Sequence, residues 1–160
     1  NSSLLRYQPD GSPDPSFGNN GLVPTDSGPW GNSFYGFYVA VQDDGKIVFA
    51  GSFDNGSDQD FGVVRYHGDG TLDTSFDGDG RATVAVGSAD DLGRNISLDA
   101  DGTIILVGSS DNGTSQDMAF ARFNADGRVV LHQDFWDSSA GLFEHIPALG
   151  WMIQSIKKRL

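Results

Sequence analysis

The sequence of 160 residues contains no cysteine, almost no glutamate and no long hydrophobic run. Without cysteine, neither a disulfide framework nor a thiolate metal site can form. A membrane-spanning helix needs roughly 20 consecutive apolar residues, and no run of that length occurs. Glu144 is the only Glu among 22 acidic residues. The Glu-rich polar faces of a helical bundle are therefore missing as well.

Basic residues are scarce too, since 10 Lys and Arg stand against 22 Asp and Glu and give a net charge of −12. This charge argues against a nucleic acid as a partner, because nucleic acids are polyanions. The chain is rich in Gly and Asp, which favour turns, and 38% of its residues are hydrophobic. It can therefore build a core, unlike a disordered acidic tail.

The sequence repeats with a period of 57 to 59 residues. LRYQPDG at 5–11 returns as VRYHGDG at 64–70 and as ARFNADG at 121–127. VQDDGKIV at 41–48 returns as LDADGTII at 98–105, and DPSFGNNG at 14–21 returns as DTSFDGDG at 73–80. Such self-similarity at a fixed period is typical of repeat architectures.

Each period predicts short strands, because runs of β-branched and aromatic residues alternate with Asp-Gly and Asn-Gly turns. The expected strands cover 3–7 and 21–24, then 38–42, 46–51, 61–66 and 81–86, then 95–98, 103–108 and 118–123. The run at 104–107 is apolar on successive positions, which predicts a strand covered on both faces. We therefore predict an all-β array of antiparallel four-stranded β-propeller blades. A β-sandwich, the alternative, would not need a repeated sequence.

The repeats divide the chain into four parts. Residues 1–33 hold the C-terminal half of one repeat, 34–93 a complete repeat and 94–128 part of a third. Residues 129–160 leave the pattern, and their apolar spacing predicts an amphipathic helix over about 147–160. This tail covers an open blade face or is foreign, frame-shifted sequence, with membrane docking as the alternative. Because propellers have about four to eight blades, we expect a piece of a longer array.

Three spaced motifs carry a resemblance to a known family. Arg-Tyr-x-x-Asp-Gly-x-x-Asp-x-Ser-Phe, Val-Gln-x-Asp-Gly-Lys-Ile-Val-x-Ala-Gly and Asp-Phe-x-Val-x-Arg-Tyr resemble the delta-60 repeats, over about residues 4–128. The resemblance implies bacterial tandem repeats with a propeller-like fold in exported or surface-associated proteins, and it assigns no catalytic residues. The chain departs from the family at 94–97, at the aromatic segment 34–38 and after residue 128.

Two acidic pairs, Asp77 with Asp79 and Asp99 with Asp101, could supply oxygen ligands to calcium. Twelve-residue loops from either pair would end in Ser where an EF-hand needs a bidentate Glu. Since Asp-Gly pairs recur wherever hairpins turn, we expect a structural role and no cofactor, with Ca²⁺ as the alternative.

The repeated charges predict a structural tie between blades, with a ring of Arg around an anionic ligand as the alternative. The repeated positions are Arg6, Arg65 and Arg122, and Asp10, Asp69 and Asp126. Catalytic signatures are missing, because the three His are scattered and neither a nucleophile elbow nor a phosphate loop occurs. We therefore expect no enzymatic activity.

An aromatic cluster is the most distinctive feature outside the repeat. Glycines flank its members, which are Trp30, Phe34, Tyr35, Phe37 and Tyr38. Such a cluster can form a platform for a sugar or peptide, or it can pack against a neighbouring blade. The sequence thus predicts a non-catalytic scaffold or binding module, and the resemblance to the delta-60 repeats implies a surface-associated or exported bacterial protein. Its partners would be a protein, a glycan or further repeats, with self-association through blade edges. The alternative is part of a propeller hydrolase or lyase that needs further blades.

Overall fold

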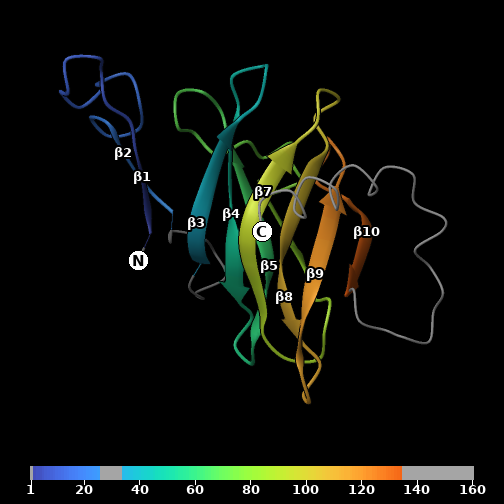
Figure 1. Ribbon diagram of the computed structural model, residues 1–160. Coiled ribbons are helices and arrows are strands. Elements are labelled where there is room, and N and C mark those ends of the chain that lie inside the picture. Colours follow the sequence, from blue (N-terminus) through green and yellow to red (C-terminus); the bar gives the residue numbers. More distant parts are fainter. Residues whose placement is uncertain (1, 26–33, 135–160) are drawn as a thin grey trace, which may run out of the picture.

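The computed structural model describes residues 2–25 and 34–134, which form three antiparallel sheets (Figure 1). The first sheet has two strands, β1 (Ser3–Leu5) and β2 (Leu22–Pro24). The second has four, β3 (Phe34–Val41), β4 (Ile47–Asp54), β5 (Gln59–Tyr66) and β6 (Arg81–Val84). The third also has four, β7 (Asp91–Leu98), β8 (Ile104–Asp111), β9 (Gln116–Phe123) and β10 (Val129–Asp134). The described residues contain no helix that could cross a membrane. The prediction of antiparallel four-stranded blades is confirmed.

Each four-stranded sheet is a meander in which neighbours in sequence are neighbours in the sheet. Strand β7, the first of its sheet, packs on β3, β4 and β5 of the sheet before it. In Figure 1 it runs across the face of that sheet, and the two sheets stand side by side. Successive repeats therefore stack face to face, as propeller blades do.

Strand β10 is an addition to the three strands that the sequence predicts for the last repeat. It pairs antiparallel with β9, and a register shift separates Val129 from Leu131. The Asp-x-Ser-Phe block that precedes β6 is missing before β10. The repeat therefore contains no motif from which this strand could be predicted. The expected helix at about 147–160 lies outside the described residues.

Two apolar clusters lie between the three sheets. One joins the two four-stranded sheets and includes Val48, Ala50, Phe61, Val63, Phe76, Ile104, Leu106 and Phe123. The other joins β1 and β2 to the second sheet and includes Leu4, Phe17, Val23, Phe34, Phe49 and Val64. Strand β4 is buried at six successive positions from Ile47. The middle sheet is therefore covered on both faces, as a blade between two neighbours requires.

The first strands of the two blades differ in burial although they occupy the same place in the repeat. Ile96 and Leu98 of β7 are partly buried and pack against the cluster between the sheets. Their counterparts in β3, Val39 and Val41, are 58% and 65% exposed. Strand β7 has a four-stranded sheet in front of it, whereas β3 has only β1 and β2 among the described strands. These valines are therefore exposed because the sheet next to β3 is smaller, and not because β3 differs from β7 in its own structure.

Candidate functional site

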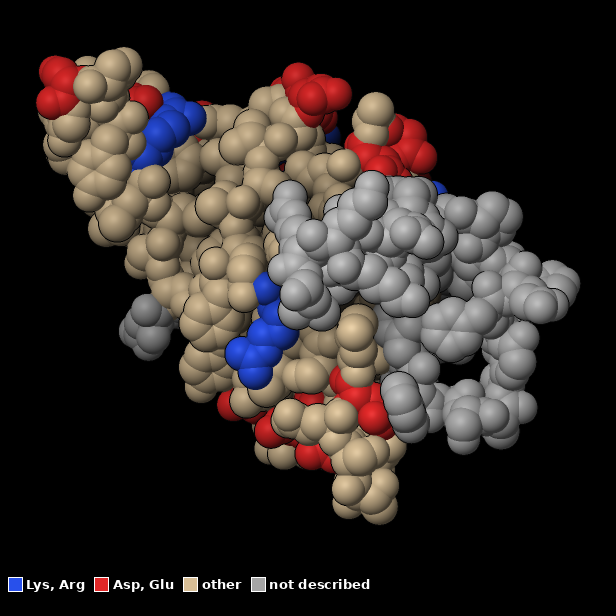
Figure 2. Space-filling view, viewed as in Figure 1, with Lys and Arg blue, Asp and Glu red and all other residues tan. Residues whose placement is uncertain are grey.

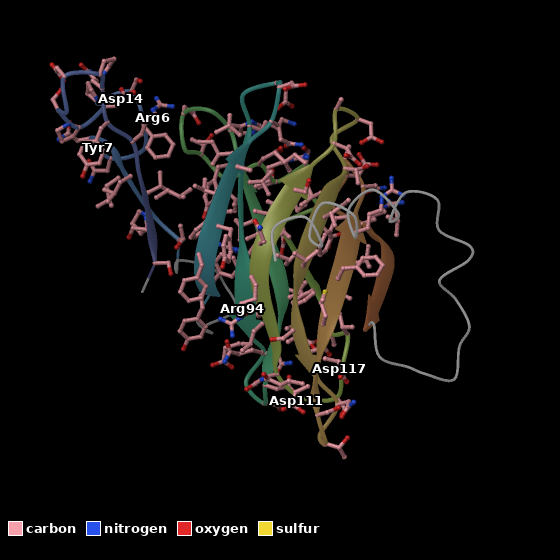
Figure 3. All side chains as sticks on the ribbon, viewed as in Figure 1. Arg6, Tyr7, Asp14, Arg94, Asp111 and Asp117 are labelled. Atoms are coloured by element: carbon pink, nitrogen blue, oxygen red, sulfur yellow. The ribbon has the colours of Figure 1, made fainter. Side chains whose placement is uncertain are left out.

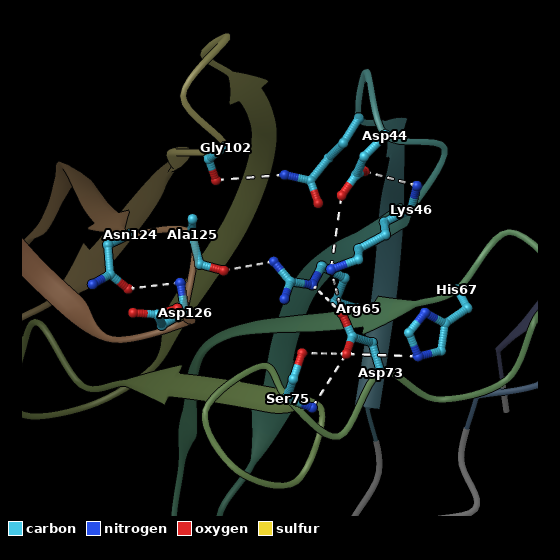
Figure 4. Close-up of polar contacts among 11 residues, drawn as sticks. Asp44, Lys46, Arg65, His67, Asp73, Ser75, Gly102, Asn124, Ala125 and Asp126 are labelled. Atoms are coloured by element: carbon cyan, nitrogen blue, oxygen red, sulfur yellow. Dashed lines mark hydrogen bonds and ion pairs between the residues drawn. The ribbon is translucent and has the colours of Figure 1, made fainter.

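The repeated arginine at the end of β5 joins the two four-stranded sheets (Figure 4). Arg65 is 4% exposed, and its Nε donates a hydrogen bond to Oδ2 of Asp73 at 2.8 Å. Its Nη1 donates to the carbonyl oxygen of Ala125 at 2.7 Å, in the turn between β9 and β10. The guanidinium carbon lies 4.5 Å from the centroid of the Phe76 ring. The buried side chain of Arg65 thus connects the loop that follows β5 to the next blade.

The same arrangement recurs one repeat earlier. Nε of Arg6, which follows β1, donates to Oδ2 of Asp14 at 2.8 Å. The guanidinium carbon lies 4.6 Å from the centroid of the Phe17 ring, and Nη1 donates to the carbonyl oxygen of Gly68 in the loop after β5. The repeated Arg, Asp and Phe therefore form one unit, which we call the inter-blade tie.

The third repeat has the arginine without the rest of the tie. Arg122 is exposed, and Val130 stands where the other repeats have the paired Asp. Within the described residues, Nη2 of Arg122 donates a single, long hydrogen bond to Oγ1 of Thr103, at 3.5 Å. The three arginines are therefore not equivalent, and two of them are already engaged within the chain.

The repeated Asp caps its own turn in the first two repeats, whereas Asn124 takes this role in the third. Oδ1 of Asp10 accepts hydrogen bonds from the backbone N–H and the hydroxyl of Ser12, and Oδ1 of Asp69 accepts the same pair from Thr71. These hydrogen bonds, from the hydroxyl first, hold the pKa of both carboxyls below the ordinary value. Each carboxylate thus stabilises a local hairpin.

The Asp-Gly turns also dock onto the preceding blade through their backbone. The carbonyl oxygen of Asp69 accepts from the N–H of Gly18 at 2.8 Å, and that of Asp126 accepts from the N–H of Asp77 at 2.6 Å. Gly127 has a φ of +90°, and a Cβ there would lie 2.8 Å from the Asp77 nitrogen. Glycine is needed at this position for its conformation and for the close approach of the two loops.

Stability should fall in acid because of Asp73. Burial acts to raise the pKa of its carboxyl, but hydrogen bonds from Ser75 and Lys46 and the charge of Arg65 outweigh burial and hold the pKa well below the ordinary value. The folded state therefore binds this proton more weakly than the unfolded chain, whose Asp pKa is about 3.9. The stabilisation is fully present above that pH and is lost as the pH falls below it.

Denaturant unfolding at a series of pH values measures this loss. The Asp73→Asn variant should show a shallower decline of unfolding free energy below about pH 4 than the wild-type chain. An identical decline in the two proteins would contradict the assignment.

A groove of about 580 Å³ lies between the β3–β4 and β7–β8 hairpins, beside the tie. Lys46 and Arg65 are its basic lining residues, and five aspartates also line it, Asp43, Asp44, Asp99, Asp101 and Asp126. The calcium candidates Asp99 and Asp101 are thus placed in the groove, apart from Asp77 and Asp79.

Two of the calcium candidates, Asp79 and Asp101, accept hydrogen bonds from the backbone of their own turns. Oδ1 of Asp101 accepts the backbone N–H of Thr103 at 2.9 Å, and this hydrogen bond lowers the pKa of Asp101. Oδ1 of Asp79 accepts the backbone N–H of Arg81 at 2.9 Å. Within 2–25 and 34–134, no three His, Asp or Glu side chains are grouped so as to hold a metal ion.

The structure divides the aromatic cluster. Phe34 is 5% exposed and packs edge-to-face on Phe49, with ring centroids 5.4 Å apart, so it belongs to the core and presents no face to a ligand. Tyr38 is half-buried on the same strand. Tyr35 and Phe37 are 38% and 68% exposed. Trp30 lies outside the described residues.

Tyr35 and Phe37 line a hollow of about 240 Å³ where β3 and β7 lie together. The remaining lining residues are Ser52, Gln59, Leu92, Gly93 and Arg94. Phe37 sits at a register shift of β3, between Gly36 and Tyr38, and Arg94 sits at the equivalent shift of β7. The bulge of β7 interrupts the alternation of exposed and buried residues along that strand. Figure 3 shows Arg94 at the lower part of this face. We call these seven residues the β3–β7 hollow.

Arg94 was not among the predicted site residues, although 94–97 departs from the repeat. The departure from the repeat at 94–97 marks Arg94 as unusual, but Arg94 lies close to Phe37 only because the two blades stack. The sequence therefore marks Arg94 as unusual, but it does not show that Arg94 lies beside Phe37.

The repeat matches a known β-propeller family. A family model described as a domain of unknown function, DUF5122, β-propeller, matches residues 1–17, 42–76 and 100–129, which together make up about half of the chain. A search of curated proteins found no match. The matched segments contain the residues of both inter-blade ties, whereas Tyr35, Phe37 and Arg94 lie outside them. The matched segments thus include the residues that tie the blades together, whereas most residues that line the hollow lie outside the match.

Proposed function

The chain belongs to the DUF5122 β-propeller family, and from this premise we propose that it is a non-catalytic repeat module that binds a glycan at the β3–β7 hollow. The observation that carries the proposal is a pair of exposed aromatic rings beside an arginine. The repeated Arg and Asp side chains at 6, 10, 14, 65, 69 and 73 are engaged in ties and turns. The side chains of Tyr35, Phe37 and Arg94 in the hollow take part in none of these ties and turns.

The shape of the hollow favours a sugar over a protein loop. Flat aromatic side chains such as those of Tyr35 and Phe37 suit the apolar face of a sugar ring, while Gln59 adds a polar side chain. At about 240 Å³ the hollow is smaller than typical small-molecule sites of roughly 300–1,000 Å³. It suits a single ring of a longer glycan.

The lining also favours binding over catalysis. The described residues of the hollow include no Asp, Glu or His, whereas glycoside hydrolysis normally needs two carboxylates beside the scissile bond. The finer assignment to the delta-60 repeats, and with it an exported or surface-associated bacterial protein, rests on the Arg-Tyr and Asp-x-Ser-Phe motifs.

Replacing Phe37 by Ala should lower glycan affinity about fivefold, because one stacking ring is lost. Val39→Ala is the matched control, since Val39 is 58% exposed on the same strand but does not line the hollow. A glycan array followed by titration calorimetry measures both. Equal affinities of the two variants would argue against the hollow, and release of product from a polysaccharide panel would favour a hydrolase or lyase.

A further inference from the structure

We infer that the ligand of the β3–β7 hollow is an acidic sugar, whose ring stacks on Tyr35 and Phe37 and whose carboxylate pairs with Arg94. This inference rests on the proposed glycan binding and names its chemical class. The charge of Arg94, its surroundings and its position beside the aromatic rings each support it.

Arg94 has no carboxylate partner in the described part of the chain. It is exposed and takes part in none of the ion pairs formed there, whereas Arg6 and Arg65 each pair with an Asp at 2.8 Å. Acidic residues outnumber basic ones by 22 to 10. Among the residues that the structure describes, no carboxylate therefore occupies the Arg94 guanidinium.

The hollow and the groove differ in charge. Five aspartates line the groove, but the hollow has one arginine and no acidic residue. Figure 2 shows a blue patch that borders tan surface at the place where Figure 3 labels Arg94, and red surface lies further down. The lining of the hollow thus carries a net positive charge, whereas that of the groove is net negative.

A sugar carboxylate uses both parts of the hollow. The planar guanidinium of Arg94 can donate two parallel hydrogen bonds to a carboxylate. Tyr35 and Phe37 line the same cavity, so a sugar held there can stack on an aromatic ring. A neutral sugar would leave the charge unused, and a small anion would leave the rings unused. A uronic acid carries a carboxylate and a ring face on one residue.

The net charge of −12 opposes an anionic ligand at long range. Salt screens that repulsion over about 8 Å at physiological ionic strength, whereas a guanidinium–carboxylate contact is direct. The pairing at Arg94 must therefore supply the preference for an acidic ligand.

The test compares a galacturonate oligomer with its methyl ester, which has the same rings without the charge. Titration calorimetry should give the wild-type chain an affinity for the acid at least about tenfold higher than for the ester. Arg94→Gln should reduce the affinity for the acid to that for the ester and leave the ester unchanged. Arg94→Lys should restore part of the difference, and Phe37→Ala should weaken both ligands. Because Arg94 and Phe37 are exposed, thermal unfolding should show these variants folded.

The alternative outcomes separate this inference from the proposed function. Equal affinities for acid and ester, or no effect of Arg94→Gln, would overturn the acidic-sugar assignment while glycan binding stands. Failure of both oligomers and of a neutral glycan panel to bind would overturn both. Binding of polyglutamate that depends on Arg94, without glycan binding, would replace the sugar with an acidic peptide.

Discussion

Replacing Arg65 with Met is expected to lower the free energy of unfolding by about 3 kcal/mol, the lower end of the range for breaking a buried ion pair. The substitution leaves the Asp73 carboxylate, whose side chain is 2% exposed, without its closest cationic partner. It also removes the donor to the Ala125 carbonyl. Lys46 Nζ remains 3.2 Å from Asp73, which limits the loss. Urea unfolding measures the change.

Arg122→Met is the matched control, because Arg122 occupies the same position in the next repeat. It is exposed, and among the described residues its side chain donates a hydrogen bond to Thr103 alone, at 3.5 Å. Its substitution should change the unfolding free energy by less than about 0.5 kcal/mol. Losses of equal size in the two variants would contradict the inter-blade tie.

Gly127→Ala should cost about 3 kcal/mol from two sources, backbone strain at a φ of +90° and displacement of the docked loop. The added methyl would lie 2.8 Å from the Asp77 nitrogen and 3.0 Å from the Phe76 ring. The hydrogen bond from Asp77 to the Asp126 carbonyl would then have to lengthen. Denaturant unfolding again measures the effect.

Gly11→Ala separates the two sources. Gly11 has the same place in its repeat and a φ of +84°, but nothing lies within 4 Å of the position of the added methyl. This variant should therefore show the conformational cost alone, about 1 kcal/mol. If Gly11→Ala and Gly127→Ala cost the same, the docking of the Asp-Gly turn on the preceding blade contributes nothing.

The repeat made most of the fold predictable from the sequence. Asp-Gly and Asn-Gly pairs at fixed offsets located the hairpins, and the runs between them gave nine of the strands within a few residues. Strand β10 escaped because its repeat lacks the Asp-x-Ser-Phe block. Local turn chemistry is visible in a sequence, but the pairing of an edge strand depends on the partner beside it.

The inter-blade tie was predictable in kind and not in detail. Recurrence of Arg65 at one strand position indicated a structural contact between blades. Its partners, Asp73 on the following loop and the carbonyl of Ala125 in the next repeat, depend on how that loop closes over the sheet. No spacing rule for strands or helices brings residues eight and 60 apart to one guanidinium.

The hollow was predictable only in part. The aromatic segment drew attention to Tyr35 and Phe37, but also to Phe34, which packs in the core. Alternation along β3 continues through Phe37, so it separates the exposed Tyr35 and Phe37 from the buried Phe34. At the bulge of β7, in contrast, two successive residues are exposed, Arg94 and Asn95. Arg94, 57 residues later, lines the same cavity only because β7 stacks on β3.

An NMR titration of ¹⁵N-labelled chain with the galacturonate oligomer shows whether the hollow binds a sugar without cleaving it. The backbone amides of Tyr35, Phe37 and Arg94 should shift during the titration, while the reducing-end signals of the sugar stay constant. Shifts centred on Gln42 and Asp101 in the groove, no shifts at all, or growing reducing-end signals would contradict binding at the hollow without cleavage.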